Sequence, residues 1–441
     1  MAHRSIGAVA RGSVGILNRS PESKMGSFMN ITRRSFLQAA VAMPIGASLA
    51  HFEALAAPAR GQIKITAIKA IETADTGTIV RIETDAGLVG YGPCHGSGPF
   101  AREIIKVVEG GAGSNTGLGL AGKDPLAIKV HFHNLFYAYA QRERHVRVWS
   151  GIDIALWDLA GKILNLPVGK LLGGNFREEI PLYSHCGHTG NFWSKEEWRA
   201  RAKELVDYPS GFKAFKVDLN DALGVTARQF VPSLGPLEVR KVQLCYDLAR
   251  ESFGPDIDII VHCHNELDLP SAIQVAAAVE HIKPLYLEDP IAPLYSDSWL
   301  ALRRTTRIPI LTGEDIELLD GALPFIQNHA VDCLQPDMID SGGITGVKMI
   351  ADLASVYRMP IALHNVSGLL LNMACQQFAA ATHNCPRIEC ARGADKPKAA
   401  ASNAPVIANG KMKVSSMPGL GLDLNLDYLK ATLAPGEPWW G

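Results

Sequence analysis

Short runs of apolar, β-favouring residues recur along the second half of the chain, and each ends on charged or imidazole side chains. Examples are 259–261 before His262 and 285–287 before Glu288. The series of strand-end candidates, in chain order, is Lys216, His262, Glu288, Glu314, Asp337, His364 and Glu389. From residue 262 onward, successive members are 26, 26, 23, 27 and 25 residues apart.

This interval has the length that one strand, one helix and two loops require, and helix-like segments such as 272–279 fill it. A single polar residue after a strand carries little information, but a series of seven, the last six at a regular spacing, favours a shared site. The pattern therefore predicts a parallel β/α sheet with reactive groups at the C-terminal strand ends, and a barrel is its closed form.

The region before this series has a different pattern. Residues 62–91 alternate between apolar and polar positions around a turn at 85–87, which predicts an antiparallel meander. Glycine-rich stretches at 92–98 and 110–122 are expected to be loops, and the second lacks the Lys-Ser/Thr of a phosphate loop.

Apolar positions from 148 to 163 have helical spacing, and Pro167 and a Gly173-Gly174 turn follow. Residues 180–184 then read as a first barrel strand. After Glu389 the chain is small and polar, and residues 405–418 predict a short strand and a turn.

Length and composition support this architecture. A chain of 441 residues suits a barrel plus a second module. Apolar residues make up 47% and charged residues 20%, as in a globular protein that buries a large core. The 43 basic and 44 acidic residues nearly cancel. Neither nucleic acid nor an anionic membrane surface is therefore indicated as a partner.

The N-terminal region predicts an export signal. Residues 32–38, with Arg33 and Arg34, resemble a twin-arginine motif, and an apolar stretch at 39–50 precedes an Ala-Leu-Ala cleavage site at 54–56. The apolar stretch is too short to span a bilayer. We therefore expect a periplasmic or otherwise exported protein without a membrane span in its mature form, and Met25 and Met29 are alternative starts.

The eight cysteines lie at scattered positions without the paired spacing of a metal site. They are expected to be individual core or strand-end residues rather than a disulfide framework. In a periplasmic protein, a bond between Cys385 and Cys390 is an alternative that the sequence leaves open.

Taken together, the order of elements resembles the enolase superfamily, in its mandelate racemase-like branch and closest to the sugar-acid dehydratases. The motifs that carry the resemblance are Gly-Ile-Asp-Ile-Ala-Leu-Trp-Asp-Leu-Ala-Gly-Lys at 151–162, Leu-Leu-Gly-Gly at 171–174, Glu-Asp-Pro at 288–290, Gly-Glu at 313–314, Pro-Asp at 336–337, Gly-Gly at 342–343 and Pro-Gly-Leu-Gly-Leu at 418–422.

The resemblance implies a modified (β/α)₇β barrel closed by an α+β capping domain. Its expected divisions are a signal and pre-sequence (1–59), the N-terminal part of the cap (60–178), the barrel (179–395) and a C-terminal segment returning to the cap (396–441). It also implies a divalent cation, ordinarily Mg²⁺, held by oxygen ligands at adjacent strand ends. Relatives are frequently homo-oligomers, and a homo-oligomer is expected here.

Two of the implied metal ligands, Glu288 and Glu314, match the family motifs. The third position is normally acidic but is His262 here, and an imidazole shifts the preference toward Mn²⁺ or another transition metal such as Fe²⁺ or Zn²⁺. A metal site weakened by this exchange is the alternative.

The reaction implied by the family begins with removal of the proton next to a substrate carboxylate. The resemblance assigns His364 as the base, oriented by Asp337, and Glu389 as a hydrogen-bonding group for the substrate carboxylate or enediolate. His264 matches the general acid of the sugar-acid dehydratases, and it faces the same side as His262 if the strand continues to it.

Lys216 and Asp218 occupy the place of the Lys-x-Lys pair of racemases. Lys216 retains a charge that can hold the substrate carboxylate, but the lysine base expected at 218 is absent. This difference favours elimination of water over racemisation. Further residues expected to contact the substrate are Asp218, His95, His185, His188 and Trp193.

The preferred hypothesis is thus a metal-dependent dehydratase that converts a sugar acid to a 2-keto-3-deoxy acid. A racemase, epimerase or cycloisomerase acting on a related acid is the enzymatic alternative. A sugar-acid-binding protein without turnover is the alternative from another class, and the retained base and acid argue against it.

Overall fold

The computed structural model describes residues 63–440, except for 110–118, 139–144, 188–189, 395–398 and 404. The predicted export signal and His188 lie outside the described residues, as does most of the second glycine-rich stretch. Within the described part of the chain, no helix combines the length and apolar character needed to cross a membrane.

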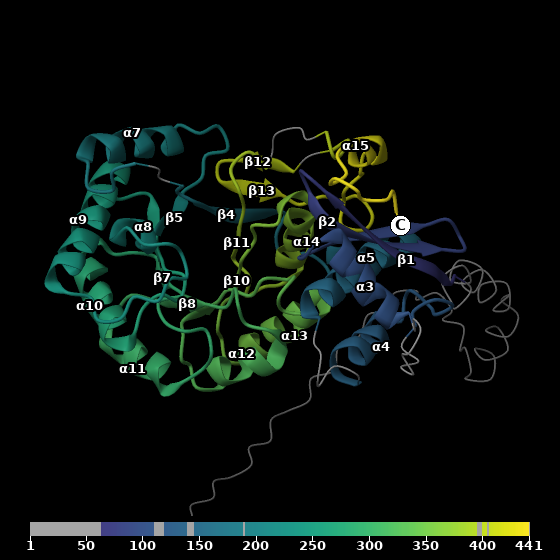
Figure 1. The fold of residues 1–441 in the computed structure, drawn as a ribbon, viewed down its shortest axis with the longest axis horizontal. Helices are drawn as coiled ribbons and strands as arrows, with labels where there is room; N and C mark the ends of the chain where they lie inside the picture. The colour runs from purple at the N-terminus through teal and green to yellow at the C-terminus, as the bar shows by residue number, and fades with distance from the viewer. Residues whose placement is uncertain are drawn as a thin grey trace, which may run out of the picture. The chain divides into compact units, whose positions relative to one another are not determined.

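Eight parallel strands form a closed barrel, shown in teal to green in Figure 1. Their hydrogen-bonded order is β10-β11-β4-β5-β6-β7-β8-β9. Parallel bridges pair Leu334 with Ile361 and Asp337 with His364, which joins β9 to β10 and closes the ring. The strands are β4 (Glu179–His185), β5 (Ala214–Asp218), β6 (Asp258–His262), β7 (Tyr286–Glu288), β8 (Ile310–Thr312), β9 (Cys333–Leu334), β10 (Ala362–Leu363) and β11 (Arg387–Glu389).

Helices alternate with these strands along the chain, as the regular spacing predicted. They are α7 (Lys195–Val206), α8 (Leu219–Leu223), α9 (Pro236–Phe253), α10 (Leu269–Val279) with the 3₁₀ turn η3 (Glu280–Ile282), α11 (Asp297–Thr305), α12 (Leu318–Gln327), α13 (Gly343–Val356) and α14 (Gly368–Ala381). Parallel neighbours need such crossover connections, whereas antiparallel neighbours can use a tight turn.

The interior of the barrel is a packed core of its own. Its buried members, Tyr183, Ala214, Ile260, Leu311, Cys333 and Ala362, come from six different strands. The hydroxyl of Tyr183 donates to the carbonyl of Leu363 and accepts from the amide of Gln335, both at 2.9 Å. Because the barrel is filled in this way, polar chemistry is confined to the end where the strands terminate.

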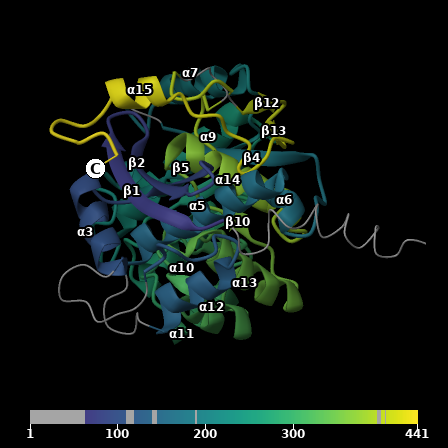
Figure 2. The same cartoon turned by 90° about the vertical axis from the view of Figure 1, so that its right-hand side faces the viewer.

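The capping domain begins with the predicted antiparallel meander, drawn in purple in Figure 2. Its strands are β1 (Ile65–Thr73), β2 (Gly77–Thr84) and β3 (Val89–Cys94), and its helices are α3 (Gly98–Val108), α4 (Ile128–His133) with the π-helical turn η2 (Asn134–Ala138), α5 (Val146–Leu164) and α6 (Val168–Leu171). The cap thus has the expected α+β composition.

The loop expected at 92–98 is shorter than predicted. Strand β3 continues to Cys94 and α3 begins at Gly98. A Cβ at Gly92 would lie 2.1 Å from the carbonyl oxygen of Gly151, and one at Gly90 would lie equally close to that of Ala155. These glycines therefore permit close packing of β3 on α5 rather than a turn.

Helix α5 contains the longest family motif, and its polar side chains connect the cap to other segments. Asp153 accepts from the backbone N–H of Thr345 at 2.9 Å, and the indole of Trp157 donates to the Thr345 hydroxyl at 2.9 Å. Asp153 thus binds the first turn of α13, where backbone N–H groups are otherwise unpaired. Burial raises the pKa of Asp153 to about 7.

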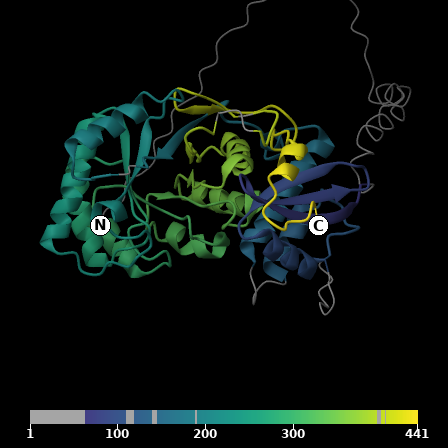
Figure 3. The same cartoon turned by 45° about the horizontal axis from the view of Figure 1, so that its top comes forward.

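The C-terminal segment is a hairpin followed by a helix, drawn in yellow in Figure 3. Strands β12 (Val406–Ala408) and β13 (Lys411–Lys413) are antiparallel, and β13 pairs with β4 of the barrel. Beyond α15 (Leu426–Ala431), the chain returns to the cap, where Ala74 N–H donates to the Thr432 carbonyl at 2.8 Å. The segment therefore contacts both barrel and cap.

All eight cysteines are buried. Cys385 and Cys390, for which a disulfide was an alternative, instead have thiols near the backbone carbonyls of Arg387 and Ala391, at 3.7 and 3.6 Å. Burial raises the pKa of Cys385 to about 12, which disfavours the thiolate needed for oxidation.

The interactions of α5 lead to a prediction about stability. Asp158 is buried and accepts from the N–H groups of Tyr91 and Leu420, both at 2.9 Å, while pairing with Lys162 one turn later. Asp158→Ala leaves these donors without that acceptor, at about 1–3 kcal/mol per buried group. We expect it to lower the free energy of unfolding by at least about 2 kcal/mol in urea titrations.

Asp352→Ala is the control, because Lys348 and Asp352 also form an i,i+4 pair on a helix, with the two residue types in reverse order and Asp352 exposed. That pair is expected to contribute less than about 0.5 kcal/mol. Equal losses in the two variants would contradict the role assigned to Asp158.

Candidate active site at the C-terminal end of the barrel

The strand register brings the predicted site residues together. Asp218 is paired with His262 across β5 and β6, and His262 is paired with Glu288 across β6 and β7. Three polar side chains thus occupy neighbouring positions at the ends of three adjacent strands. All three are buried, so their environment differs strongly from water.

Glu314 joins them from beyond the end of β8, and Gly313 makes this possible. Gly313 has φ +147°, and a Cβ there would lie 2.8 Å from the backbone nitrogen of Gln335. Another residue would be strained by both the backbone angle and the contact. The Gly-Glu motif therefore allows the chain to pass close to the end of β9 with Glu314 next to Glu288.

His262, Glu288 and Glu314 have the arrangement of a cation site. Each offers one ligand atom, and these atoms lie within 4.8 Å of one another. Within the described residues, His262 Nε2 and Glu288 Oε2 are buried without a hydrogen-bond partner. Such atoms are costly to bury unless something binds them. Two carboxylates and one imidazole therefore fit a divalent cation.

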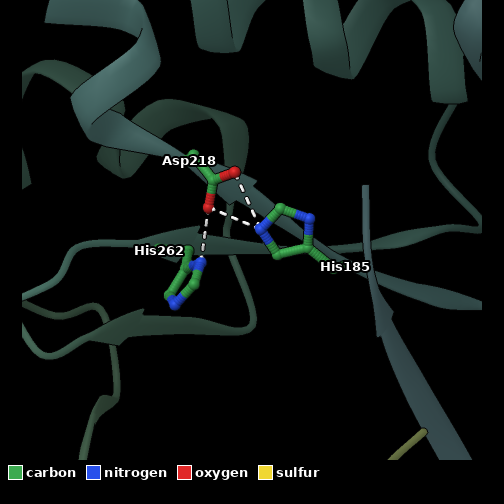
Figure 4. Close-up of side chains that lie close together, drawn as sticks. All are labelled: His185, Asp218 and His262. Carbon is green, nitrogen blue, oxygen red and sulfur yellow. Dashed lines mark hydrogen bonds and ion pairs between the residues drawn. The ribbon is translucent and has the colours of Figure 1, made fainter. Parts of the chain in front are cut away.

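On its other side, His262 contacts Asp218. The Asp218 carboxylate lies between His262 Nδ1, at 2.6 Å, and His185 Nε2, at 2.8–2.9 Å (Figure 4). Burial raises the pKa of Asp218, but hydrogen bonds from both histidines outweigh it and hold that pKa well below its usual range. Burial, and next the Lys216 ammonium, lower the pKa of His262, which favours a neutral imidazole.

Lys216 provides a buried positive charge among the carboxylates. Its Nζ lies 2.7 Å from Glu288 Oε1 and 3.2 Å from Glu389 Oε1. Burial alone lowers the pKa of Lys216, but the surrounding carboxylates outweigh it and raise that pKa above its ordinary value. The ammonium is therefore charged, and it links β5 to β7 and β11.

His364 and Asp337 form the dyad that the sequence predicted. Nδ1 of His364 lies 2.8 Å from Asp337 Oδ2, and Nε2 faces Glu314 and Glu389 at 3.3 and 3.8 Å. Burial lowers the pKa of His364, but the bond to Asp337 and the other carboxylates raise it to about 10. The imidazole is therefore protonated in this arrangement and has strong basicity.

His264 lies just beyond the end of β6, and its ring centroid is 4.1 Å from that of His262. Strand β6 ends at His262 and does not continue to His264, as the expectation had assumed, but the two rings nevertheless lie in contact. Its Nδ1 is 3.3 Å from Glu266 Oε1. Burial lowers the pKa of His264, but Glu266 and the more distant acidic groups raise it overall. A protonated imidazole, which can donate a proton, is thereby favoured.

The order of strands places these two imidazoles on opposite walls. His364 follows β10 and His264 follows β6, and three strands separate β10 from β6 in each direction around the ring of eight. Glu288 and Glu314 lie along one arc between them, and Lys216 and Glu389 lie along the other. A molecule in the barrel mouth can therefore face a basic group on one side and a proton donor on the other.

The other residues predicted to contact the substrate, His95, Trp193 and His185, lie in three separate surroundings. His95 of the cap lies 2.5 Å from the Ser367 hydroxyl and 4.0 Å from Asp340, so it reaches the barrel loops after β10 and β9. Trp193 instead lies over Lys241 of α9, whose Nζ is 5.1 Å from the ring centroid. His185 contacts Asp218, as described above.

Sequence reasoning missed two groups near the candidate ligands. Arg228, with φ +65°, pairs with Glu314 and Asp315 at 2.8 and 2.7 Å. Nothing in its loop sequence indicated this role. Asp289, buried with φ +44°, accepts from the Thr312 hydroxyl. Asp289 is part of the Glu-Asp-Pro motif. The motif alone did not indicate that Asp289 has partners different from those of Glu288.

Comparison with known proteins agrees with this fold. Residues 54–173 match the mandelate racemase/muconate lactonizing enzyme N-terminal domain, and residues 197–428, more than half of the chain, match the enolase C-terminal domain-like family. The chain belongs to the enolase superfamily, in its mandelate racemase/muconate lactonizing enzyme branch.

Among individual relatives, the chain is 30% identical to a D-xylonate dehydratase of Haloferax volcanii, over 81% of this chain and 86% of that protein. It is 27% identical to a D-galactonate dehydratase of Xanthomonas euvesicatoria, over 86% and 96%. A mandelate racemase/muconate lactonizing enzyme-like structure from Rubrobacter xylanophilus has a TM-score of 0.75 at 30% identity, covering 86% of this chain and 99% of that one.

Proposed function

We propose that this protein is a metal-dependent dehydratase of a sugar acid of the aldonate type, forming a 2-keto-3-deoxy acid. The observation that carries the proposal is the placement of a base, His364, and a proton donor, His264, on opposite walls of one barrel mouth. The relatives named as dehydratases of D-xylonate and D-galactonate support the same class of reaction.

His364 is proposed to remove the proton next to the substrate carboxylate through Nε2. Asp337 binds Nδ1 at 2.8 Å, which fixes the ring and leaves Nε2 directed toward the acidic cluster. The imidazole must be neutral to accept a proton, so its raised pKa makes the reaction favour higher pH. The Glu314 carboxylate is one cause of the raised pKa of His364. A cation that bound Glu314 would offset its negative charge and so lower that pKa.

Removing this proton leaves a dianionic enediolate, and positive charge must lie near its oxygens. Lys216 is proposed to provide part of this charge and to hold the substrate carboxylate, and Glu389 to hydrogen-bond to it. Glu288, Glu314 and His262 are proposed to bind the divalent cation, Mg²⁺ or a transition metal, which when bound stabilises negative charge on those oxygens.

His264 is proposed to donate a proton to the departing hydroxyl group. Hydroxide is a poor leaving group, so elimination needs a donor positioned on that side of the substrate. Among the described residues, neither Asp218 nor Lys216 suits the role of a second base, because Asp218 is bonded to two histidines and Lys216 is held charged by carboxylates. One base and one acid suit loss of water better than racemisation.

The direct test is to supply a panel of aldonic acids and to measure 2-keto-3-deoxy acid formation, with metal analysis of the purified protein. We expect one or a few acids to be dehydrated, and chelation to abolish the reaction until a divalent cation is restored. Interconversion of epimers without loss of water would instead support the racemase alternative. Tight binding without either reaction would support a binding protein.

The dyad predicts the result of replacing its imidazole. His364→Asn removes the base while retaining a side chain that fills part of the space. We expect turnover and exchange of the α-proton in D₂O, followed by NMR, to fall by at least about 10²-fold, with substrate binding retained. His281→Asn is the control, because His281 and Asp247 form a similar 2.5 Å pair at an exposed site. Full exchange by His364→Asn would place the base elsewhere.

The proton donor is tested separately. Proton abstraction by His364 does not require His264, whereas loss of hydroxide does. His264→Asn should therefore reduce keto-acid formation by about 10²–10⁴-fold while α-proton exchange continues. The two signals can be recorded in one NMR experiment in D₂O. Undiminished keto-acid formation would show that another group acts as the acid.

We also propose export through the twin-arginine signal at residues 32–38, because that pathway carries folded proteins and so allows metal binding before transport. Replacing Arg33 and Arg34 together by lysine should shift the protein from the periplasmic to the cytoplasmic fraction, as measured by immunoblotting. Replacing the exposed residues Arg240 and Arg304 together by lysine serves as the control, because both are present whichever start is used. An unchanged periplasmic fraction would exclude this route.

A further inference from the structure

We propose that Asp218 is a positioning residue for the cation site, and that it makes His262 a nitrogen ligand through Nε2. The inference rests on the proposed metal site and assigns Asp218 a role other than contact with the substrate. It concerns the two positions, 218 and 262, at which this chain departs from the family pattern.

The two nitrogens of His262 have different partners. Nδ1 lies 2.6 Å from Asp218 Oδ1, whereas Nε2 has no hydrogen-bond partner within the described residues and lies 3.4 Å from Glu288 Oε1. A neutral imidazole carries one proton, and the acceptor at Nδ1 keeps that proton there. The lone pair is thus left on Nε2, on the side of Glu288 and Glu314.

The surroundings hold this orientation. His262 is 3% exposed and its strand position is paired with Asp218 on one side and with Glu288 on the other. Asp218 is itself fixed by a second bond, from His185 Nε2. Figure 4 shows the carboxylate between the two rings, with the second nitrogen of His262 directed away from it.

The pair of Asp218 and His262 keeps one negative charge near the cation site, but the atom that faces the cation site is a nitrogen instead of an oxygen. The family pattern has an acidic residue at position 262, and here the carboxylate lies one strand away at 218. A carboxylate behind a ligating imidazole increases the basicity of the ring and fixes its orientation. Nitrogen ligation favours transition metals over Mg²⁺. The pair is therefore expected to shift the preference toward Mn²⁺ without removing negative charge.

The test measures binding of Mn²⁺ and Mg²⁺ to the purified metal-free protein by calorimetry, with pulsed electron paramagnetic resonance of bound Mn²⁺. We expect a nitrogen coupling in the wild type that is absent in His262→Asp. Removal of such supporting groups typically costs 10–100-fold in metal affinity. Asp218→Asn should therefore weaken Mn²⁺ binding by 10–100-fold, and His262→Asp should raise the affinity for Mg²⁺ relative to Mn²⁺.

The double variant, Asp218→Asn with His262→Asp, distinguishes orientation of the His262 ring by Asp218 from a general effect of the Asp218 charge on metal binding. In the His262→Asp background there is no imidazole to orient, so Asp218→Asn should then change Mn²⁺ affinity by less than about 3-fold. Asp221→Asn is the charge-matched control, because Asp221 is a nearby carboxylate that is bonded to Asn220. Equal losses with and without His262, or an equal loss in Asp221→Asn, would overturn the role of Asp218.

The outcomes also distinguish this inference from the proposed function. Mn²⁺ bound to the wild type without nitrogen coupling would overturn the inference, even if a sugar acid is dehydrated. Nitrogen coupling together with the predicted loss in Asp218→Asn would support it, even if no acid in the panel reacts. The wild-type spectrum needs no variant, so misfolding of Asp218→Asn would not prevent a decision on the ligand.

Discussion

The mouth of the barrel depends on the balance of charge between buried carboxylates and the few cations beside them. Glu288, Glu314 and Glu389 converge from three strands, and their mutual repulsion is strong because little water screens it. Lys216 bridges two of them, and Arg228 pairs with the third from outside. Burial, followed by the adjacent carboxylates, raises the pKa of Asp289, which reflects the same crowding. Burying such a cluster is costly unless positive charge lies close to it, so the same geometry that concentrates negative charge here favours the binding of a cation.

The cap takes part in this site through a small number of polar contacts. His95 reaches Ser367, and Arg147 at the start of α5 pairs with Asp340 at 2.5 Å. Both barrel partners lie on the loops after β9 and β10, which also carry Asp337 and His364. The α5 motif that most clearly identified the family therefore has a structural role, since it holds the helix whose first turn carries Arg147.

Much of the fold followed from periodic patterns in the sequence. The alternation in 62–91 and the regular spacing after residue 262 predicted the meander and the barrel, because burial imposes these periods on strands and on β/α units. The contact of Asp218 with two histidines was not predicted, because side-chain pairing depends on the register between β5 and β6. Arg228 was missed for a similar reason, since a loop residue has no period that reveals its direction. Gly92 was assigned to a loop rather than to β3, because close packing and turns both select glycine.

The shortness of β9 and β10 has a consequence for how the protein loses activity. Each has two residues, and the ring closes there through bridges that include the one between Asp337 and His364, with His364 N–H donating to the Pro336 carbonyl at 3.3 Å. Few backbone hydrogen bonds join this seam, whereas β5 and β6 are paired over five positions. Segments with little such support open with a smaller free energy than the rest of a protein. The proposed base thus lies on a sparsely paired part of the ring, so local opening there would remove activity while β5, β6 and the surrounding helices are still formed.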